Sequence, residues 1–226
     1  MPRKGLGVPD AGLAEGVRFW RAEAGAWAGR DCAIFAPGPS LAPAVVALAE
    51  QRPGPLTAIA IGDAWELCRW AAIVYHCDVA WWAHPDKAGV FAHAGFKLAL
   101  HDRARPPPAG VRVLRKGAET GYDPDPGVLC TGRNSGYQAI HLALHYRPRR
   151  IVLIGFDMRM VGGRRHFFGD HPAGLNRCAI YHDYAPAFDH LAGAAAELGV
   201  EILNATPGSA VTAFPIVAPA EAFGRA

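Results

Sequence analysis

Two histidines and an aspartate fall within the six-residue loop HFFGDH, which runs from His166 to His171. Histidine is the usual general base near neutral pH, because its ordinary pKa is about 6.5. His171 precedes Pro172, and a following proline restricts the backbone and helps to fix the ring. We therefore expect His171 to be a catalytic base, with His166 as the alternative. The spacings from these residues to Cys178 and His182 match no zinc pattern, so we expect no metal site.

A carboxylate follows the most apolar segment of the chain. Residues 151–154 read IVLI, with no alternation of polar residues, which predicts a central strand covered on both faces. Asp157 comes just after that strand, through Gly155 and Phe156. A carboxylate there can orient a ribose or a catalytic group, hold a divalent ion, or accept backbone N–H bonds. We expect Asp157 to belong to the active site, and these roles stay open.

Three turns of small and polar residues occur at predicted strand ends, at 38–40 (GPS), 133–136 (RNSG) and 204–209 (NATPGS). A strand that turns through glycine and serine into a helix presents N–H groups and a hydroxyl to a phosphate. Ser40 is also a good helix N-cap, so its role stays open. We predict that the three turns line one crevice. The residues assigned to a nucleotide are Gly38, Pro39, Ser40, Gly62, Asp63, Arg133, Asn134, Ser135 and Gly136.

Alternating strands and helices must position these turns. Apolar runs predict strands at 32–36, 56–61, 79–82, 96–100, 128–131, 151–154 and 200–203. Helical spacing predicts helices within 17–27, 41–51, 65–70, 87–93, 136–147 and 184–198, with Ser135 as the N-cap of the fifth. This alternation favours a doubly wound α/β fold with a mainly parallel, Rossmann-like sheet. In such a sheet, ligands bind beyond the carboxyl ends of the strands.

Length and composition favour one domain over residues 1–226, with a loose N-terminal arm at 1–15. A proline-rich stretch predicts an irregular loop or insertion at 102–126. No apolar run approaches the roughly 20 residues of a membrane span, and the N-terminus has no apolar signal core. We therefore expect a cytoplasmic protein. The chain has no P-loop, GxGxxG or GxSxG motif, which disfavours Walker kinases, standard dehydrogenases and α/β-hydrolases.

Five segments carry a family resemblance: GPSL at 38–41, SGYQAIHLAL at 135–144, IVLIGFDM at 151–158, HFFGDHP at 166–172 and NATPGSAVTAFP at 204–215. They resemble phage and bacterial Rossmann-like proteins of the norphogenetic and DUF115-like group, the latter including a pterin pyrophosphokinase. More remotely, they are similar to bacterial sialyltransferases of the Cst type. The resemblance implies the GT-A-variant form of the Rossmann-like fold.

The sialyltransferase resemblance implies roles for individual residues. The GPSL turn would contact the cytidine monophosphate donor, and so would Arg133, Ser135 and Gly136. The second histidine of the loop, His171, would activate the acceptor hydroxyl. The extra residue Asp170 shifts the alignment, which leaves His166 as the other candidate. The family has a donor-contacting asparagine where this chain has Gly62-Asp63, and another asparagine, before a proline, where this chain has His84. Its phosphate-holding tyrosines are not evident after Asp157, where the segment to Arg165 offers arginines instead.

The implied activity is metal-independent transfer of a sugar from a nucleotide sugar to a hydroxyl, in a phage- or prophage-derived enzyme that needs no cofactor of its own. One alternative is a pyrophosphokinase of the DUF115 type, using ATP and Mg²⁺ with Asp63, Asp78 and Asp157. The other is a non-enzymatic phage assembly protein that forms a homo-oligomer. Trp81 and Trp82 would form its interface, although packing in the core explains them at least as well. Phage DNA as the acceptor would need a basic groove assembled in three dimensions, because the net charge of +3 does not indicate one.

Overall fold

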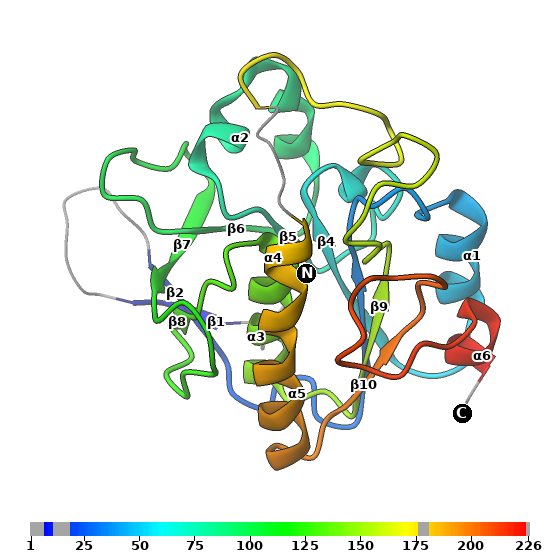
Figure 1. Ribbon diagram of the computed structural model, residues 1–226. Coiled ribbons are helices and arrows are strands. Elements are labelled where there is room, and N and C mark those ends of the chain that lie inside the picture. Colours follow the sequence, from blue (N-terminus) through cyan, green and yellow to red (C-terminus); the bar gives the residue numbers. More distant parts are fainter. Residues whose placement is uncertain (1–6, 11–18, 176–180, 225–226) are drawn as a thin grey trace.

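One sheet runs through the middle of the molecule (Figure 1), and the computed structural model describes residues 7–10, 19–175 and 181–224. The strand order is β1-β2-β7-β6-β5-β4-β3-β9-β10, and β8 pairs with β7. Only β1 and β2 pair antiparallel, while the other pairs of these strands are parallel. The fold is thus the doubly wound, mainly parallel α/β fold that the sequence predicts. The strands are β1 (Gly7–Asp10), β2 (Phe19–Ala22), β3 (Asp31–Phe35), β4 (Leu56–Ile61), β5 (Ile73–Tyr75), β6 (Phe96–Leu100), β7 (Val111–Lys116), β8 (Val128–Leu129), β9 (Arg150–Ile154) and β10 (Glu201–Asn204).

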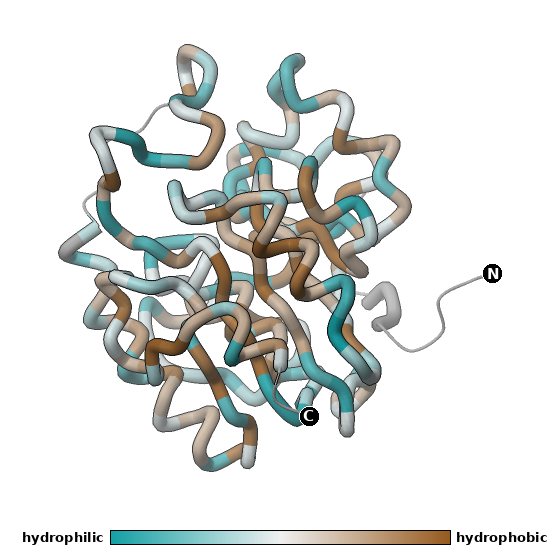
Figure 2. Tube along the Cα trace, turned by 90° about the vertical axis from the view of Figure 1, so that its right-hand side faces the viewer, coloured by the Kyte–Doolittle hydropathy of each residue, from teal (hydrophilic) through white to brown (hydrophobic). Residues whose placement is uncertain are grey.

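Helices cover both faces of the sheet. One face packs side chains such as Ile34 and Leu153 against α3 (Ser135–Tyr146) and α5 (Phe188–Glu197). The opposite face packs Phe35 and Val152 against a second set of helices. In Figure 2, apolar residues concentrate in the interior of the molecule, and most of the hydrophilic ones lie toward its outside. The helices on the face of Phe35 and Val152 are α1 (Pro43–Gln51), the 3₁₀ helices η1 (Gly62–Glu66) and η2 (Pro85–Ala92), α2 (Val79–Ala83) and α6 (Pro219–Gly224). Two short helices, α4 (Tyr181–Tyr184) and η3 (Ala185–Ala187), come just before α5 in the chain.

The order of the strands reverses at β3. From β3 the chain adds β4, β5, β6 and β7 outward in one direction, and then it returns through α3 to β9 on the other side of β3. All five residues of both β3 and β9 are buried, as expected for central parallel strands. Loops that leave neighbouring strands in opposite directions open a crevice beyond their carboxyl ends. The carboxyl ends of β3 and β9 are therefore where a ligand site is expected.

Two buried histidines attach α3 to the loop in front of it. The Nδ1 of His141 accepts the Cys130 backbone N–H at 3.1 Å, and its Nε2 lies 3.1 Å from the Asp123 carbonyl. The Nε2 of His145 lies 3.0 Å from the Val128 carbonyl. Burial lowers the pKa of His141 to about 3 and also lowers the pKa of His145, so both rings are neutral at pH 7.

Several predicted elements differ from the structure. Within the expected helix at 17–27, residues 19–22 form β2, because Trp20 is fully buried against the sheet. The expected strand at 79–82 is α2, which begins after Asp78, whose carboxylate accepts the Ala80 N–H at 2.8 Å. The strand at this position in the sheet is β5, which is too short to give a clear apolar pattern.

The stretch 102–126, predicted to be irregular, contains β7, so that prediction is wrong for residues 111–116. Alternation of Val111 and Val113 with arginines marks β7 as a strand, but the prolines before it hide the pattern. Of the predicted arm at 1–15, the structure describes residues 7–10 alone, and these form β1. Across the described ranges, no helix has the length and apolarity to cross a membrane.

Candidate functional site

The GPS turn after β3 packs directly on the turn after β9. The Gly38 N–H donates to the Gly155 carbonyl at 3.1 Å. A Cβ on Gly38 would lie 2.2 Å from that carbonyl oxygen and 2.2 Å from Oδ2 of Asp157, so only glycine fits. Gly155 itself has φ of 73°, a left-handed conformation that favours glycine. These two turns therefore form one rigid wall at the point where the strand order reverses.

Asp157 is buried in that wall and binds Ser40. Its Oδ2 accepts the Ser40 backbone N–H at 3.2 Å and the Ser40 hydroxyl at 2.8 Å. The Ser40 N–H and hydroxyl, which the sequence offered to a phosphate, therefore both donate to a carboxylate. Ser40 is also not the N-cap of α1, because that position is Ala42. Asp157 holds the first turn in place, which is the structural role that the sequence left open.

The RNSG turn lies at the N-terminus of α3. Asn134, and not Ser135 as predicted, is the N-cap: its Oδ1 accepts the Tyr137 N–H at 2.8 Å. The Ser135 hydroxyl accepts the Cys77 N–H at 3.1 Å and so connects α3 to the loop after β5. Arg133 has φ of 58°, which is uncommon outside glycine and typical of functional sites. The first-turn N–H groups of α3 have no acceptor within the helix and suit an anion.

His171 faces a buried carboxylate. Its Nδ1 lies 3.4 Å from Oδ2 of Asp63, whose residue is 2% exposed. The other oxygen of Asp63 accepts the Lys87 ammonium at 2.6 Å, and Oδ2 also receives the indole N–H of Trp81 at 3.3 Å. Asp63, predicted to bind the nucleotide, therefore has its oxygens directed at protein groups behind His171. Orienting a catalytic group was one of the roles left open for Asp157, but the carboxylate that faces His171 in the structure is Asp63.

The ring of His166 packs beside His171, with 4.6 Å between their centroids. Its Nδ1 lies 3.2 Å from the Gly169 carbonyl, within its own loop. The pKa of His171 is lowered to about 4, mainly by burial. The neighbouring His166 and Lys87 also lower it, and the Asp63 carboxylate raises it only in part. Burial lowers the pKa of His166 as well. Of the two candidate bases, His171 is the one paired with a carboxylate, and its ring is neutral at pH 7.

A third histidine, His76, enters the site and was missed by sequence reasoning. It follows β5, a strand that was itself not predicted, and its ring stacks on Trp81 with 4.8 Å between centroids. Its Nδ1 accepts the Asp78 N–H at 3.1 Å. Burial lowers its pKa to about 4. A neutral ring with Nδ1 as acceptor carries its proton on Nε2, beside Gly62, where a Cβ would approach the ring to 3.1 Å.

The third small-residue turn, at 204–209, supports the site from behind. The Thr206 hydroxyl accepts the Phe156 N–H at 3.1 Å, and the Ser209 hydroxyl donates to the Phe156 carbonyl. Residues of this turn do not line the two cavities described below. The prediction of one crevice holds for the first two turns, while the third fixes the position of the turn after β9.

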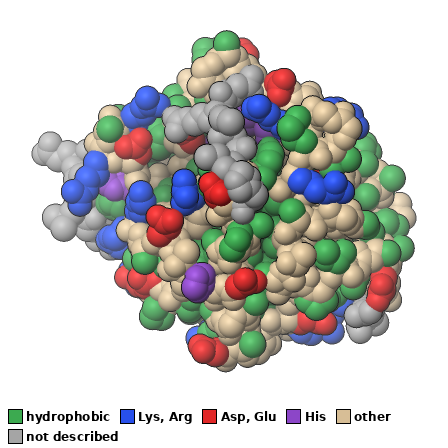
Figure 3. Space-filling view, viewed as in Figure 1, with side chains coloured by type: hydrophobic (Ala, Val, Ile, Leu, Met, Phe, Trp, Pro, Cys, Tyr) green, Lys and Arg blue, Asp and Glu red, His purple; other side chains and the backbone are tan. Residues whose placement is uncertain are grey.

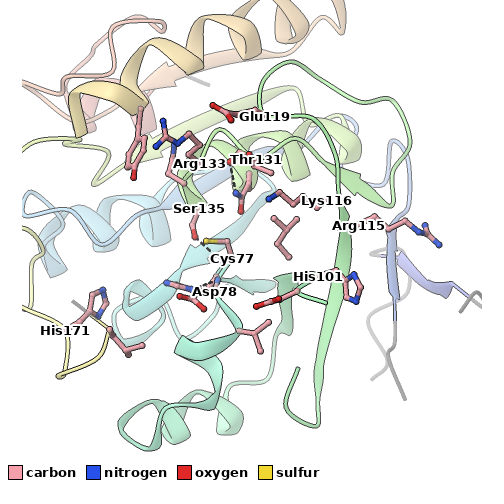
Figure 4. A pocket seen from close by; sticks show the side chains of 18 of the residues that line it. Cys77, Asp78, His101, Arg115, Lys116, Glu119, Thr131, Arg133, Ser135 and His171 are labelled. Carbon is pink, nitrogen blue, oxygen red and sulfur yellow. Dashed lines mark hydrogen bonds between the residues drawn. The ribbon is translucent and has the colours of Figure 1, made fainter. Parts of the chain in front are cut away.

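Two cavities meet at His171. The smaller, of about 190 Å³, is lined by the GPS turn, the turn after β9 and the N-terminus of α3. The larger, of about 1150 Å³, extends from there past the ends of β6 and β7 (Figure 4). Residues that line both are His76, Asn134, Ser135, Met158, Arg165, His166, His171 and Tyr181. His171 is thus in a wall shared by two spaces, as a group acting between two substrates must be.

Among the residues that the structure describes, no three His, Cys, Asp or Glu side chains converge to hold a metal ion. Asp63, Asp78 and Asp157, the carboxylates of the Mg²⁺ alternative, each bind different protein groups. Cys178, considered as a zinc ligand, lies outside the described residues. Searches of protein-family models, of curated proteins and of solved structures each returned no match to this chain.

Proposed function

We propose that this protein transfers a sugar from a nucleotide sugar to a hydroxyl acceptor, with His171 as the general base. The observation that carries the proposal is the Asp63–His171 pair at the wall shared by the two cavities. It lies beyond the carboxyl ends of parallel strands, where doubly wound folds bind ligands. The resemblance of the GPSL, RNSG and HFFGDHP segments to sialyltransferases supports the same reading.

In the proposed reaction, Asp63 faces Nδ1 of His171, which leaves Nε2 to accept a proton. As the acceptor oxygen bonds to the anomeric carbon, its proton passes to Nε2, and the bond from that carbon to the donor phosphate breaks. The nucleotide leaves with the bonding electrons as a phosphate oxygen. Asp63 stabilises the imidazolium that forms. Arg165 and Arg133, which line the cavity, offset the charge on the leaving phosphate.

The donor nucleotide is expected beside the N-terminus of α3. The first-turn N–H groups of Ser135 and Gly136, with Arg133 next to them, provide donors for a phosphate. Ser40 is a weaker candidate than the sequence indicated, because Asp157 holds both of its donors. Gly38 and Pro39 line the smaller cavity and provide a surface without side-chain charge. The 190 Å³ of that cavity suit a single ring system of the donor.

Calorimetry with CMP, CDP, UMP, UDP, GDP and ATP, each with and without Mg²⁺, tests the donor. The proposal requires tight binding of one nucleotide without Mg²⁺. Binding of ATP with Mg²⁺ alone would support the pyrophosphokinase instead. A chain that binds none of them would fit the assembly protein.

The variant His171→Ala tests the base. General-base catalysis contributes typically about 10²- to 10⁴-fold, so transfer should fall by that factor while nucleotide affinity stays within about twofold. The matched control is His166→Ala, which removes the neighbouring ring without touching Asp63. Equal losses in the two variants, or full activity of His171→Ala, would contradict the assignment.

A further inference from the structure

The larger cavity continues well beyond the proposed nucleotide position. Its volume of about 1150 Å³ exceeds the range of about 300–1,000 Å³ that is usual for pockets of drug-sized ligands, and the smaller cavity adds to it. The continuation is formed by His101, Asp102 and Arg103 after β6 and by Arg115 and Lys116 at the end of β7. We refer to these five residues as the far arm. A second ligand can lie there while a nucleotide occupies the near part.

The lining of the larger cavity is positively charged. It includes five arginine and lysine side chains and three carboxylates, a net of two positive charges, whereas the whole chain has a net of three. Two of the carboxylates, Asp78 and Asp102, accept local backbone N–H bonds. Figure 4 shows Lys116 extending from the end of β7 toward the middle of the cavity. In Figure 3, several lysine and arginine side chains gather on the part of the surface over β7, with acidic ones between them.

Aromatic rings accompany these cations. The Arg133 guanidinium lies 5.4 Å from the centre of the Tyr184 ring, and the Arg115 guanidinium lies 4.9 Å from that of Phe19. All four side chains line the larger cavity, but Phe19 is buried, and Tyr184 is the half-buried ring of the two. Flat guanidinium and aromatic faces stack with nucleobases, while lysine and arginine charges bind the phosphates between them. An anionic polysaccharide has charges but no planar rings to stack.

We infer that the acceptor is a single-stranded nucleic acid, whose phosphates lie along the far arm and whose bases stack near Tyr184. The inference rests on the proposed function for the transfer itself, but binding of the strand can be measured without it. This cavity is the basic groove that a nucleic-acid acceptor requires, and the net charge of the chain does not reveal it.

Fluorescence anisotropy with a labelled oligothymidylate of about ten nucleotides, within the usual site size of one binding module, tests the inference. We expect binding that weakens with salt, with a slope of log K against log salt of about −0.7 for each phosphate contacted. Lys116→Glu should weaken binding about tenfold and reduce the slope by about one contact. The matched control is Arg30→Glu, a charge reversal at another exposed position, between β2 and β3 and outside the cavity lining.

A second variant separates nucleic acid from other polyanions. Tyr184→Leu should weaken oligothymidylate binding roughly tenfold and leave binding of heparin unchanged, because heparin has no bases. Circular dichroism of each variant checks that the fold is intact. No binding of the oligonucleotide at low salt, or equal effects of Tyr184→Leu on both polymers, would overturn the inference. Nucleotide calorimetry tests the proposed function separately. If the chain binds no nucleotide, binding of the oligonucleotide can still be measured, and the reverse also holds.

Discussion

His171 belongs to a row of titratable groups in which the Lys87 ammonium and the neutral His171 ring contact the same carboxylate. Asp63 is shared between the ammonium group at 2.6 Å and the imidazole at 3.4 Å. Because Lys87 neutralises much of the Asp63 charge, the carboxylate orients the ring without making it strongly basic. The pKa of His171, about 4, means that the base is available at neutral pH without prior deprotonation. If His171 is the base, kcat/KM should fall on the acid side only as the pH approaches that value.

Replacing Lys87 with methionine should raise the pKa of His171. The variant removes a positive charge that disfavours the imidazolium and leaves Asp63 unopposed beside it, so the value should rise by about one pH unit or more. NMR titration of the His171 ring signals measures this without any assay of activity. Lys97→Met is the control, since the Lys97 ammonium binds the His93 carbonyl at 2.6 Å, away from this row. An unchanged His171 pKa in Lys87→Met would show that the ammonium group does not act on the ring.

Residue types alone indicated which side chains gather at the site, but not which carboxylate faces which histidine. The histidine loop and the polar strand ends are visible in the sequence, and the two cavities do meet at His171. Which carboxylate faces His171 depends on the order of the strands in the sheet. Asp63 follows β4 and lies beside His171, whereas Asp157 follows β9 and accepts hydrogen bonds from Ser40. Both carboxylates follow apolar strands, so the sequence pattern does not separate them.

At the scale of elements, the N-terminus of α3 determines how the proposed phosphate donors are presented. Asn134 accepts the Tyr137 N–H and donates to the Gly132 carbonyl at 2.7 Å, so its side chain connects the turn to the helix. Asn134→Ala should lower the free energy of unfolding by about 1 kcal/mol, the usual cost of losing an N-cap. Urea denaturation measures it.

The control for this prediction is Asn134→Ser, which keeps an oxygen that can cap the helix. It should retain most of the stability that the alanine variant loses, because serine is nearly as good an N-cap as asparagine. Nucleotide affinity should follow the same order, since a frayed first turn no longer aligns its N–H groups. Equal stability of the wild type and Asn134→Ala would show that the cap contributes nothing here.

Most strands were predictable from their apolar runs, but β5 and β7 were not. The apolar runs of β3, β4, β6 and β9 appear close to their observed bounds. β5 has only three residues, and the prolines before β7 hide its alternation of valines with arginines, so neither strand was predicted. The omission of β5 hid His76, which follows it, and the omission of β7 hid Arg115 and Lys116 of the far arm, which lie at its end.

At the scale of the whole molecule, the buried histidines of α3 make stability depend on pH. His141 and His145 are neutral in the folded protein, and burial lowers the pKa of both. In the unfolded chain each takes up a proton near its ordinary value of about 6.5. The unfolded state thus binds more protons below that pH, so the free energy of unfolding should decrease as the pH falls from about 6.5 toward 3, the pKa of folded His141.

Denaturation with urea at a series of pH values measures this effect. Each buried histidine contributes up to about 1.4 kcal/mol per pH unit, so His141→Gln should have a shallower slope than the wild type by about that amount. The slope is the relevant quantity, because the substitution also lowers stability at every pH. His190→Gln, at an exposed position of α5, is the control and should keep the wild-type slope. Parallel slopes for all three proteins would contradict the prediction.

The position of β3 between β4 and β9 has a consequence for synthesis of the protein on the ribosome. One edge of β3 pairs with β4, which emerges soon after it, but the other edge pairs with β9, whose Arg150 aligns with Asp31. Until residues 150–154 have emerged, the edge of Cys32, Ala33, Ile34 and Phe35 has no partner strand. An apolar strand edge left open is a template for pairing with other chains. The nascent protein is therefore exposed to aggregation through this edge in the interval between the emergence of β3 and that of β9.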